Sequence, residues 1–128
     1  MNKLHDILLL DDDRMVHLLV DRLSRQAALP WRIRHVYFLE EALRLIQDQS
    51  FDLMLSDIHL QPPHNVWQLL RRIPAENKLN VVIVSSSVDA EARTQAIQFE
   101  RIKAIIEKPL PMPQIQFIHR QLLQANKA

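Results

Sequence analysis

The segment FDLMLSD, residues 51–57, decides the fold. Its apolar centre is short and continuous, which is typical of a strand that is covered on both faces of a parallel sheet. A carboxylate, Asp57, closes the segment. Because open parallel sheets bind their ligands beyond the carboxyl ends of the strands, we expect Asp57 to lie at the centre of the functional site.

Apolar segments of two kinds alternate on both sides of this stretch. Short apolar or alternating runs, which predict strands, occupy residues 7–10, 32–37, 51–57, 79–84 and 104–107. Apolar residues at helical spacing occupy residues 14–28, 38–49, 66–73, 89–99 and 113–124. Five strands that alternate with five helices predict an α/β fold, with a parallel sheet and helices on both of its faces. Asp12 or Asp13 is expected to cap the first of these helices, and Asp13 fits the role of a cap better than that of a metal ligand.

The length of 128 residues is typical of one domain, so we expect a single domain over residues 1–128, with residues 124–128 as a tail or the start of a linker. The 16 basic and 15 acidic residues leave a net charge of +1, which gives no argument for a nucleic-acid or membrane partner. Asp6 interrupts any signal-peptide-like start, and no apolar run approaches the ~20 residues of a membrane span. A soluble, cytoplasmic protein is the expectation.

Cysteine and glycine are both absent from the sequence. The lack of cysteine excludes a disulfide framework and a cysteine-based zinc site. The lack of glycine excludes the standard P-loop, the dinucleotide-binding fingerprint and the nucleophile elbow of serine hydrolases, which need glycine at fixed places. It also predicts that any turn with a positive φ uses asparagine, aspartate or a similar residue.

Polar residues follow four of the five predicted strands. Asp11 and Asp12 follow the first, Asp57 closes the third, Ser85 follows the fourth and Lys108 follows the fifth. Because the carboxyl ends of parallel strands share one edge of the sheet, we expect these groups to converge. Neighbouring carboxylates repel unless a cation lies among them, and their hard oxygens suit Mg²⁺. With a lysine and a hydroxyl to bind phosphate oxygens, such a carboxylate can attack a phosphoryl group and become an acyl phosphate.

In this order and spacing, Asp11-Asp12, Asp57, Ser85 and Lys108-Pro109 resemble the CheY-like receiver domain of two-component response regulators, over about residues 4–123. The resemblance implies a (βα)5 doubly wound, flavodoxin-like three-layer sandwich with the strand order 2-1-3-4-5. It also implies that a histidine kinase or a phosphotransfer protein phosphorylates Asp57, which switches a protein-interaction surface. In this family the lysine binds the phosphoryl group, and its peptide bond with the proline is often cis.

The same resemblance assigns further roles near the acceptor. Asp11, Asp12 and Asp57 would bind Mg²⁺ (or Mn²⁺), together with the backbone carbonyl of His59. Ser85 would be the switch hydroxyl, which follows the phosphoryl group. The downstream partner would be a protein, bound on the face of the fourth helix, fifth strand and fifth helix, and this face can also support a homodimer.

The sequence departs from the family in three places. Where the family has Asp-Gly after the acceptor loop, this chain has His64-Asn65, and we expect Asn65 to take the left-handed turn. Where the family has an aromatic residue that rotates with the switch, this chain has Ile105. The family's proline four residues after the acceptor is replaced by Gln61, which Pro62-Pro63 follow.

Two other classes of protein stay open at this point. A phosphatase of the haloacid-dehalogenase type, with Asp11 as nucleophile, fits the run Asp11–Asp13, but that family needs further carboxylates after the lysine and none follows Glu107. A pseudo-receiver, which binds proteins without phosphorylation, fits the altered loop and Ile105. In the favoured interpretation the chain is a signalling domain and not an enzyme, beyond its own phosphorylation and dephosphorylation, and it contacts neither nucleic acid nor membrane directly.

Overall fold

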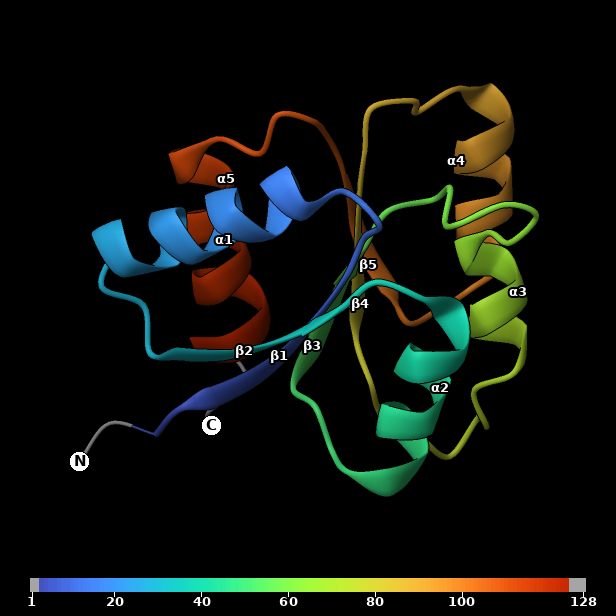
Figure 1. The fold of residues 1–128 in the computed structure, drawn as a ribbon, viewed down its shortest axis with the longest axis horizontal. Coiled ribbons are helices and arrows are strands. Elements are labelled where there is room, and N and C mark those ends of the chain that lie inside the picture. Colours follow the sequence, from blue (N-terminus) through green and yellow to red (C-terminus); the bar gives the residue numbers. More distant parts are fainter. Residues whose placement is uncertain (1–2, 125–128) are drawn as a thin grey trace.

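The centre of the computed structural model, which describes residues 3–124, is a five-stranded sheet with all neighbouring strands parallel (Figure 1). The strands are β1 His5–Leu10, β2 Trp31–Val36, β3 Leu53–Ser56, β4 Val81–Ser85 and β5 Ile102–Glu107. Their order across the sheet is β2-β1-β3-β4-β5, which confirms the expected doubly wound topology. The strand that precedes Asp57 is therefore the central one.

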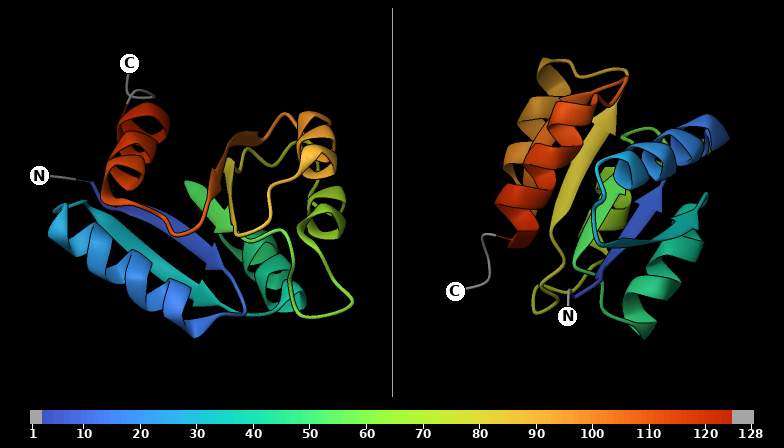
Figure 2. Two further views of the ribbon diagram at one scale, coloured as in Figure 1. Left: turned by 90° about the horizontal axis from the view of Figure 1, so that it is seen from above. Right: turned by 90° about the vertical axis from the view of Figure 1, so that its left-hand side faces the viewer.

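Helices form a layer on each face of the sheet. They are α1 Arg14–Gln26, α2 Leu39–Asp48, α3 Val66–Arg71, α4 Ala90–Ile97 and α5 Met112–Ile118, which is continued by a π-helical segment, His119–Gln124. Helices α1 and α5 cover one face, and α2, α3 and α4 cover the other (Figures 1 and 2), so the expected three-layer sandwich is confirmed. Within residues 3–124, no helix has the length and apolar character needed to cross a membrane. Residues 125–128 of the predicted tail lie outside the described residues.

Two apolar clusters, one on each face of the sheet, hold the layers together. Met54 belongs to the cluster under α2, α3 and α4, whereas Leu53 and Leu55 belong to the cluster under α1 and α5. All four residues of β3 are buried, as predicted for a strand that is covered on both faces. Burying a leucine side chain contributes ~1.5–3 kcal/mol relative to leaving it exposed, so this strand accommodates a carboxylate only at its open end.

The loop after β3 differs from the expectation at Asn65. This residue has φ −140° and ψ 169°, which is extended backbone, so the predicted left-handed conformation is wrong. Its side chain accepts a hydrogen bond from the Gln68 N–H at 3.1 Å, and the Gln68 side chain accepts one from the Asn65 N–H at 2.9 Å. This capping box begins α3, and it explains why asparagine suits the position.

The left-handed residue in the described range is Ala28, with φ 53°. It follows α1, where the Leu29 N–H donates to the Ser24 carbonyl at 2.9 Å and the Ala28 N–H donates to the Arg25 carbonyl at 3.0 Å. Together these bonds form a Schellman motif, which requires a positive φ at this point. The expectation that asparagine or aspartate takes such a turn is therefore wrong, because the bonds that end the helix impose the conformation on an alanine.

Replacing Ala28 by glycine is expected to stabilise the protein by about 0.5–1 kcal/mol. Left-handed backbone costs alanine ~1–2 kcal/mol, and the larger entropy that glycine loses on folding cancels part of the gain. The midpoint of thermal unfolding, followed by circular dichroism, should rise by a few degrees. Ala27, with φ −83°, is the matched control, and Ala27→Gly should lower the midpoint. An Ala28→Gly variant that melts at or below the wild-type temperature would contradict this account.

Candidate functional site

Two neighbouring strands bring Asp11 and Asp57 to the same edge of the sheet. Leu10 ends β1 and Ser56 ends β3, and these two residues are register partners in the parallel pair. The next residue along each strand is an acid, so the register places the two carboxylates side by side. The Asp57 N–H also donates to the Leu10 carbonyl at 3.2 Å, which extends the pairing to the acid itself.

Lys108 joins these two carboxylates. Its Nζ donates to Oδ2 of Asp11 and to Oδ2 of Asp57, each at 2.9 Å. The main-chain N–H of Lys108 donates to the Ser85 carbonyl at 2.9 Å. The Lys108-Pro109 peptide is cis, as the family resemblance implies. Because hydrogen bonds between an ammonium and carboxylates are among the strongest in proteins, one lysine ties together the ends of β1, β3 and β5.

Backbone N–H groups hold the other oxygen of each carboxylate. Oδ1 of Asp11 accepts from the Asp13 N–H at 2.9 Å, and Oδ1 of Asp57 accepts from the Ile58 N–H at 2.6 Å. Asp13 in turn accepts from the Met15 N–H at 2.9 Å and caps α1, as predicted. Both carboxylates are thus oriented in advance, which reduces the entropy lost when a charged ligand binds between them.

Burial determines the charge balance of this cluster. Asp11 is only 1% exposed, and burial raises the pKa of its carboxyl in spite of the attraction of Lys108. Burial alone would lower the pKa of Lys108, but its hydrogen bonds with Asp11 and Asp57 outweigh this effect and raise that pKa. In an exposed ion pair the pKa of the acid would fall, so desolvation is the stronger influence at Asp11. An additional cation beside Asp11 would favour its ionised form.

Asp12 lies on the same loop but outside the Lys108 cluster. It is exposed, and within residues 3–124 its carboxylate has no hydrogen-bond or ion-pair partner. Of the three carboxylates expected to converge, two therefore meet, and no group of three or more histidine or acidic side chains in that range is arranged to hold a metal ion. Mg²⁺ needs only one or two protein carboxylates when phosphate and water complete its shell, so these hard oxygen donors still fit this ion.

The loop after β3 presents the carbonyl of His59. This residue pairs with Asn65 in an isolated antiparallel bridge. The two hydrogen bonds of the bridge, at 3.1 Å and 2.8 Å, are made by the residues on either side of His59. The His59 carbonyl takes part in neither of these two bonds.

The predicted switch residues lie beside the cluster. Ser85 is buried at the end of β4, and its hydroxyl accepts a long hydrogen bond, 3.3 Å, from the Ser87 N–H instead of contacting Asp57. Ile105 lies half-buried on the neighbouring strand β5, where it packs against the apolar cluster under α2, α3 and α4. The Ser85 hydroxyl therefore lies beside the cluster of Asp11, Asp57 and Lys108. Ile105 lies on the face of the sheet that α2, α3 and α4 cover.

His17 is a residue of this region that the sequence motifs do not single out. It lies on the buried face of α1, and its Nε2 is 2.9 Å from the main-chain carbonyl of Asp11. Burial lowers the pKa of its imidazole. Its burial could have been predicted from helical spacing, because His17 lies on the same face of α1 as Val20 and Ser24, which face the sheet.

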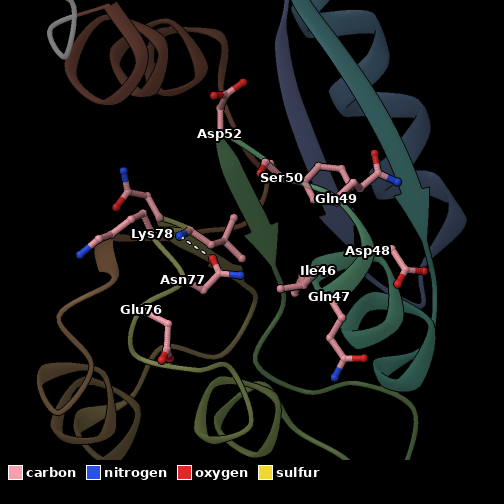
Figure 3. A pocket seen from close by; sticks show the side chains of 12 residues that line it. Ile46, Gln47, Asp48, Gln49, Ser50, Asp52, Glu76, Asn77 and Lys78 are labelled. Atoms are coloured by element: carbon pink, nitrogen blue, oxygen red, sulfur yellow. Dashed lines mark hydrogen bonds between the residues drawn. The ribbon is translucent and has the colours of Figure 1, made fainter.

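Two pockets of different character lie at the two ends of the sheet. One, of about 640 Å³, is lined by the α2–β3 and α3–β4 connections, and Asp52, Glu76 and Lys78 are among its side chains (Figure 3). It lies at the amino ends of the strands, where parallel sheets do not usually bind ligands. The other, of about 330 Å³, is apolar and lies between α1 and the β5–α5 connection, with Lys108 and Pro109 in its wall. Of these two pockets, the apolar one adjoins the acidic cluster, through Lys108.

Comparisons with known proteins agree with this arrangement. The model of the response regulator receiver domain matches residues 7–119. The chain is similar to the receiver domain of sensor histidine kinase PA1611 from Pseudomonas aeruginosa PAO1, whose crystal structure has a magnesium ion coordinated in the active site cleft. That pair is 22% identical over 94% of this chain and 98% of the other, with a TM-score of 0.79.

Two further solved structures show the same likeness. The signal receiver domain of an HD domain-containing protein from Pseudomonas fluorescens Pf-5 is 23% identical, over 96% of this chain and 97% of the other, with a TM-score of 0.83. A CheY-like response regulator receiver domain from Methylobacillus flagellatus is 21% identical, over 94% and 99%, with a TM-score of 0.74. No curated protein matches the chain. At these identities the structural likeness shows the fold.

Proposed function

The chain belongs to the response regulator receiver domain family, and we propose that it is a phosphoacceptor whose Asp57 takes a phosphoryl group from a histidine kinase or a phosphotransfer protein. The observation that carries this proposal is the position of Lys108, whose Nζ is 2.9 Å from both the Asp57 and the Asp11 carboxylates. A carboxylate that is oriented, buried and bound to an ammonium is suited to attack a phosphoryl group. Residues 1–128 would form one such domain.

The proposed reaction forms one bond and breaks another. An oxygen of the Asp57 carboxylate attacks the phosphorus of the donor's phosphohistidine, and the P–N bond breaks with its electron pair left on the imidazole nitrogen. Asp57 becomes an acyl phosphate. Lys108 is then placed to neutralise a phosphoryl oxygen as negative charge develops. In phosphoryl transfer, such electrostatic stabilisation is usually the largest contribution that the protein makes to catalysis.

A divalent cation, Mg²⁺ or Mn²⁺, is proposed to bind beside Asp57 and to neutralise the remaining charge of the phosphoryl group. Asp11, Asp12, Asp57 and the His59 carbonyl would hold it. Two observations support this set: the carboxylate of Asp12 has no partner within residues 3–124, and the His59 carbonyl stays outside its bridge.

The donor protein is proposed to dock on α1, beside the pocket next to Lys108. Met15 and Leu18 are 67% and 62% exposed on this helix, although large apolar side chains are usually buried in a globular domain. The apolar pocket of about 330 Å³ continues this surface as far as Lys108 and Pro109. A protein that covers these side chains would bring its phosphohistidine to the open end of β3.

The output surface is proposed to be the face of α4, β5 and α5, which would bind a downstream protein or a second copy of the chain. Phosphorylation adds about −1.5 to −2 charges, and the Ser85 hydroxyl, which accepts a long hydrogen bond from the Ser87 N–H, can donate its own hydrogen to a phosphoryl oxygen. Ile105, on β5, would transmit this movement. Ile97 of α4 is 84% exposed, which leaves an apolar contact available on this face.

Acetyl phosphate and Mg²⁺, followed by intact mass measurement, test the proposed function. The wild-type protein should gain one phosphoryl group, and an Asp57→Asn variant should gain none. Asp52→Asn is the matched control, because Asp52 is a carboxylate at the other end of the same strand region. A wild-type protein that gains no phosphoryl group would contradict the proposal and would favour a phosphorylation-independent interaction module.

A further inference from the structure

We propose that His17 is a positioning residue for the metal-binding loop: it fixes the main-chain carbonyl of Asp11 and thereby sets the affinity of the site for Mg²⁺ without touching the ion. The inference rests on the proposed function, because the metal site is part of that proposal. It concerns a buried histidine of α1 that lies outside the cluster formed by Asp11, Asp57 and Lys108.

The hydrogen-bond partners of His17 define its role. A carbonyl oxygen only accepts hydrogen bonds, so Nε2 of His17 must donate to the Asp11 carbonyl, 2.9 Å away. A neutral imidazole with its proton on Nε2 has an accepting Nδ1. Nδ1 of His35 lies 2.7 Å from that nitrogen and therefore donates to it. The tautomer of His17 that suits Asp11 is thus selected from the neighbouring strand.

A carboxylate completes this chain of hydrogen bonds. Oδ1 of Asp21 lies 3.2 Å from Nε2 of His35 and accepts a hydrogen bond from it when His35 is the imidazolium, the form in which both ring nitrogens donate. The chain runs from Asp21 on α1, through His35 on β2, to His17 on α1 and then to Asp11 after β1. Two imidazoles, those of His35 and His17, therefore link α1, β2 and the loop after β1.

Aromatic packing and burial keep His17 in place. Its ring lies 4.3 Å from the ring of Tyr37, measured between centroids, and the guanidinium of Arg14 lies 5.4 Å from the centroid of the Tyr37 ring. His17 is 3% exposed, so water has little access to replace it as the donor to Asp11. In a buried site a hydrogen bond that is lost leaves its acceptor unsatisfied, at a cost of ~1–3 kcal/mol.

The bond to His17 fixes the peptide plane between two proposed metal ligands. The carbonyl of Asp11 belongs to the peptide that links it to Asp12, and in a trans peptide the C=O and N–H groups point in opposite directions. With the carbonyl held by His17, the Asp12 N–H must point away from α1. The Asp11 N–H is held by the Val36 carbonyl at 3.2 Å, so Asp11 is fixed through its backbone as well as through its carboxylate. Without His17 the loop has to be ordered by the ion itself, which weakens binding.

The competing explanation is that His17 only fills space in the core. That explanation predicts a loss of stability with unchanged metal affinity when His17 is replaced. The positioning role predicts a loss of affinity, because groups that orient metal ligands from outside typically contribute 10–100-fold to metal binding. Glutamine places an amide N–H close to where the imidazole has its Nε2–H, so it separates the two explanations.

The experiment measures the Kd of Mn²⁺ from the electron paramagnetic resonance signal of the free ion, for folded wild-type protein and variants. His17→Leu should weaken Mn²⁺ binding by about tenfold or more, and His17→Gln should restore most of the affinity. Ser24→Ala is the matched control, since Ser24 is another buried polar residue of α1 and donates to the Asp21 carbonyl. Its Kd should equal that of the wild-type protein. At saturating Mg²⁺, His17→Leu should be phosphorylated by acetyl phosphate at nearly the wild-type rate, because Asp57 and Lys108 are unchanged.

If His17→Leu does not fold, His35→Leu gives the same test, since it removes the partner of His17 and leaves the contact with Asp11. It should weaken Mn²⁺ binding in the same direction but less. Wild-type affinity in the folded His17 variant, or in the folded His35 variant where His17→Leu does not fold, would overturn the positioning role and leave the proposed function intact. A wild-type protein that binds no Mn²⁺ would overturn both.

Discussion

Replacing Lys108 by methionine is expected to slow the phosphorylation of Asp57 by acetyl phosphate by about 10²–10³-fold, which is the usual effect of removing one charge-stabilising donor. Lys108 is the group that meets both the Asp11 and the Asp57 carboxylates, at 2.9 Å each. Methionine keeps most of the length and apolar character of the side chain but removes the ammonium. The rate of phosphoryl gain, followed by intact mass at saturating Mg²⁺, measures the effect.

The same variant should also be less stable in the absence of Mg²⁺. Asp11 is buried, and breaking a buried ion pair by removing one partner typically destabilises a protein by ~3–5 kcal/mol. We expect less here, because the side chain of Lys108 is partly exposed. Lys103→Met is the matched control, since Lys103 is an exposed lysine of β5, the strand that Lys108 follows, and it should change neither the rate nor the stability. A Lys108→Met protein that is phosphorylated within a few-fold of the wild-type rate would contradict the assigned role.

Mg²⁺ is expected to stabilise the unphosphorylated protein against heat. A ligand at a hundred times its Kd stabilises the folded state by about 2.7 kcal/mol, which corresponds to a rise of several degrees in the unfolding midpoint of a domain of this size. Asp12→Asn should lose most of this rise at the same Mg²⁺ concentration, because Asp12 is the one of the three proposed ligand carboxylates that has no partner within residues 3–124. Differential scanning calorimetry with and without Mg²⁺ measures both effects.

Asp13→Asn is the control for the Mg²⁺ experiment. Asp13 lies next to Asp12 but caps α1 through the Met15 N–H, and asparagine caps helices as well as aspartate does. This variant should keep the full Mg²⁺-dependent rise. An equal rise in the Asp12→Asn and wild-type proteins would remove Asp12 from the metal site, and a wild-type midpoint that does not respond to Mg²⁺ would remove the site itself.

The features that depend on one strand at a time could be predicted from the sequence. The buried strand before Asp57, the acids after the first strand and the lysine after the fifth are each visible in a short window. A parallel sheet must bring such strand ends to one edge, so the sheet topology follows from the alternation of strands and helices. For this reason the convergence of Lys108 with Asp11 and Asp57 at one edge of the sheet could be predicted from the sequence.

The backbone conformations that depend on the pairing of main-chain hydrogen bonds in turns and caps could not be predicted. The left-handed residue is Ala28, because a Schellman motif ends α1 there, whereas Asn65 is extended because it begins a helix. Side-chain direction was equally hidden: the Ser85 hydroxyl contacts the Ser87 N–H, and the imidazole of His17 contacts the carbonyl of Asp11. The conformation of each of these residues depends on hydrogen-bond partners that are distant in the sequence or on competing local hydrogen bonds. The spacing of residue types does not specify these partners.

The identity of the phosphorylated residue tests the central claim most directly. After incubation with acetyl phosphate and Mg²⁺, borohydride reduces an aspartyl phosphate to homoserine, and peptide mass spectrometry then locates the changed position. We expect homoserine at position 57 and nowhere else. Homoserine at position 11 would contradict the receiver mechanism and would support the phosphatase type of chemistry, in which the acid after the first strand is the nucleophile.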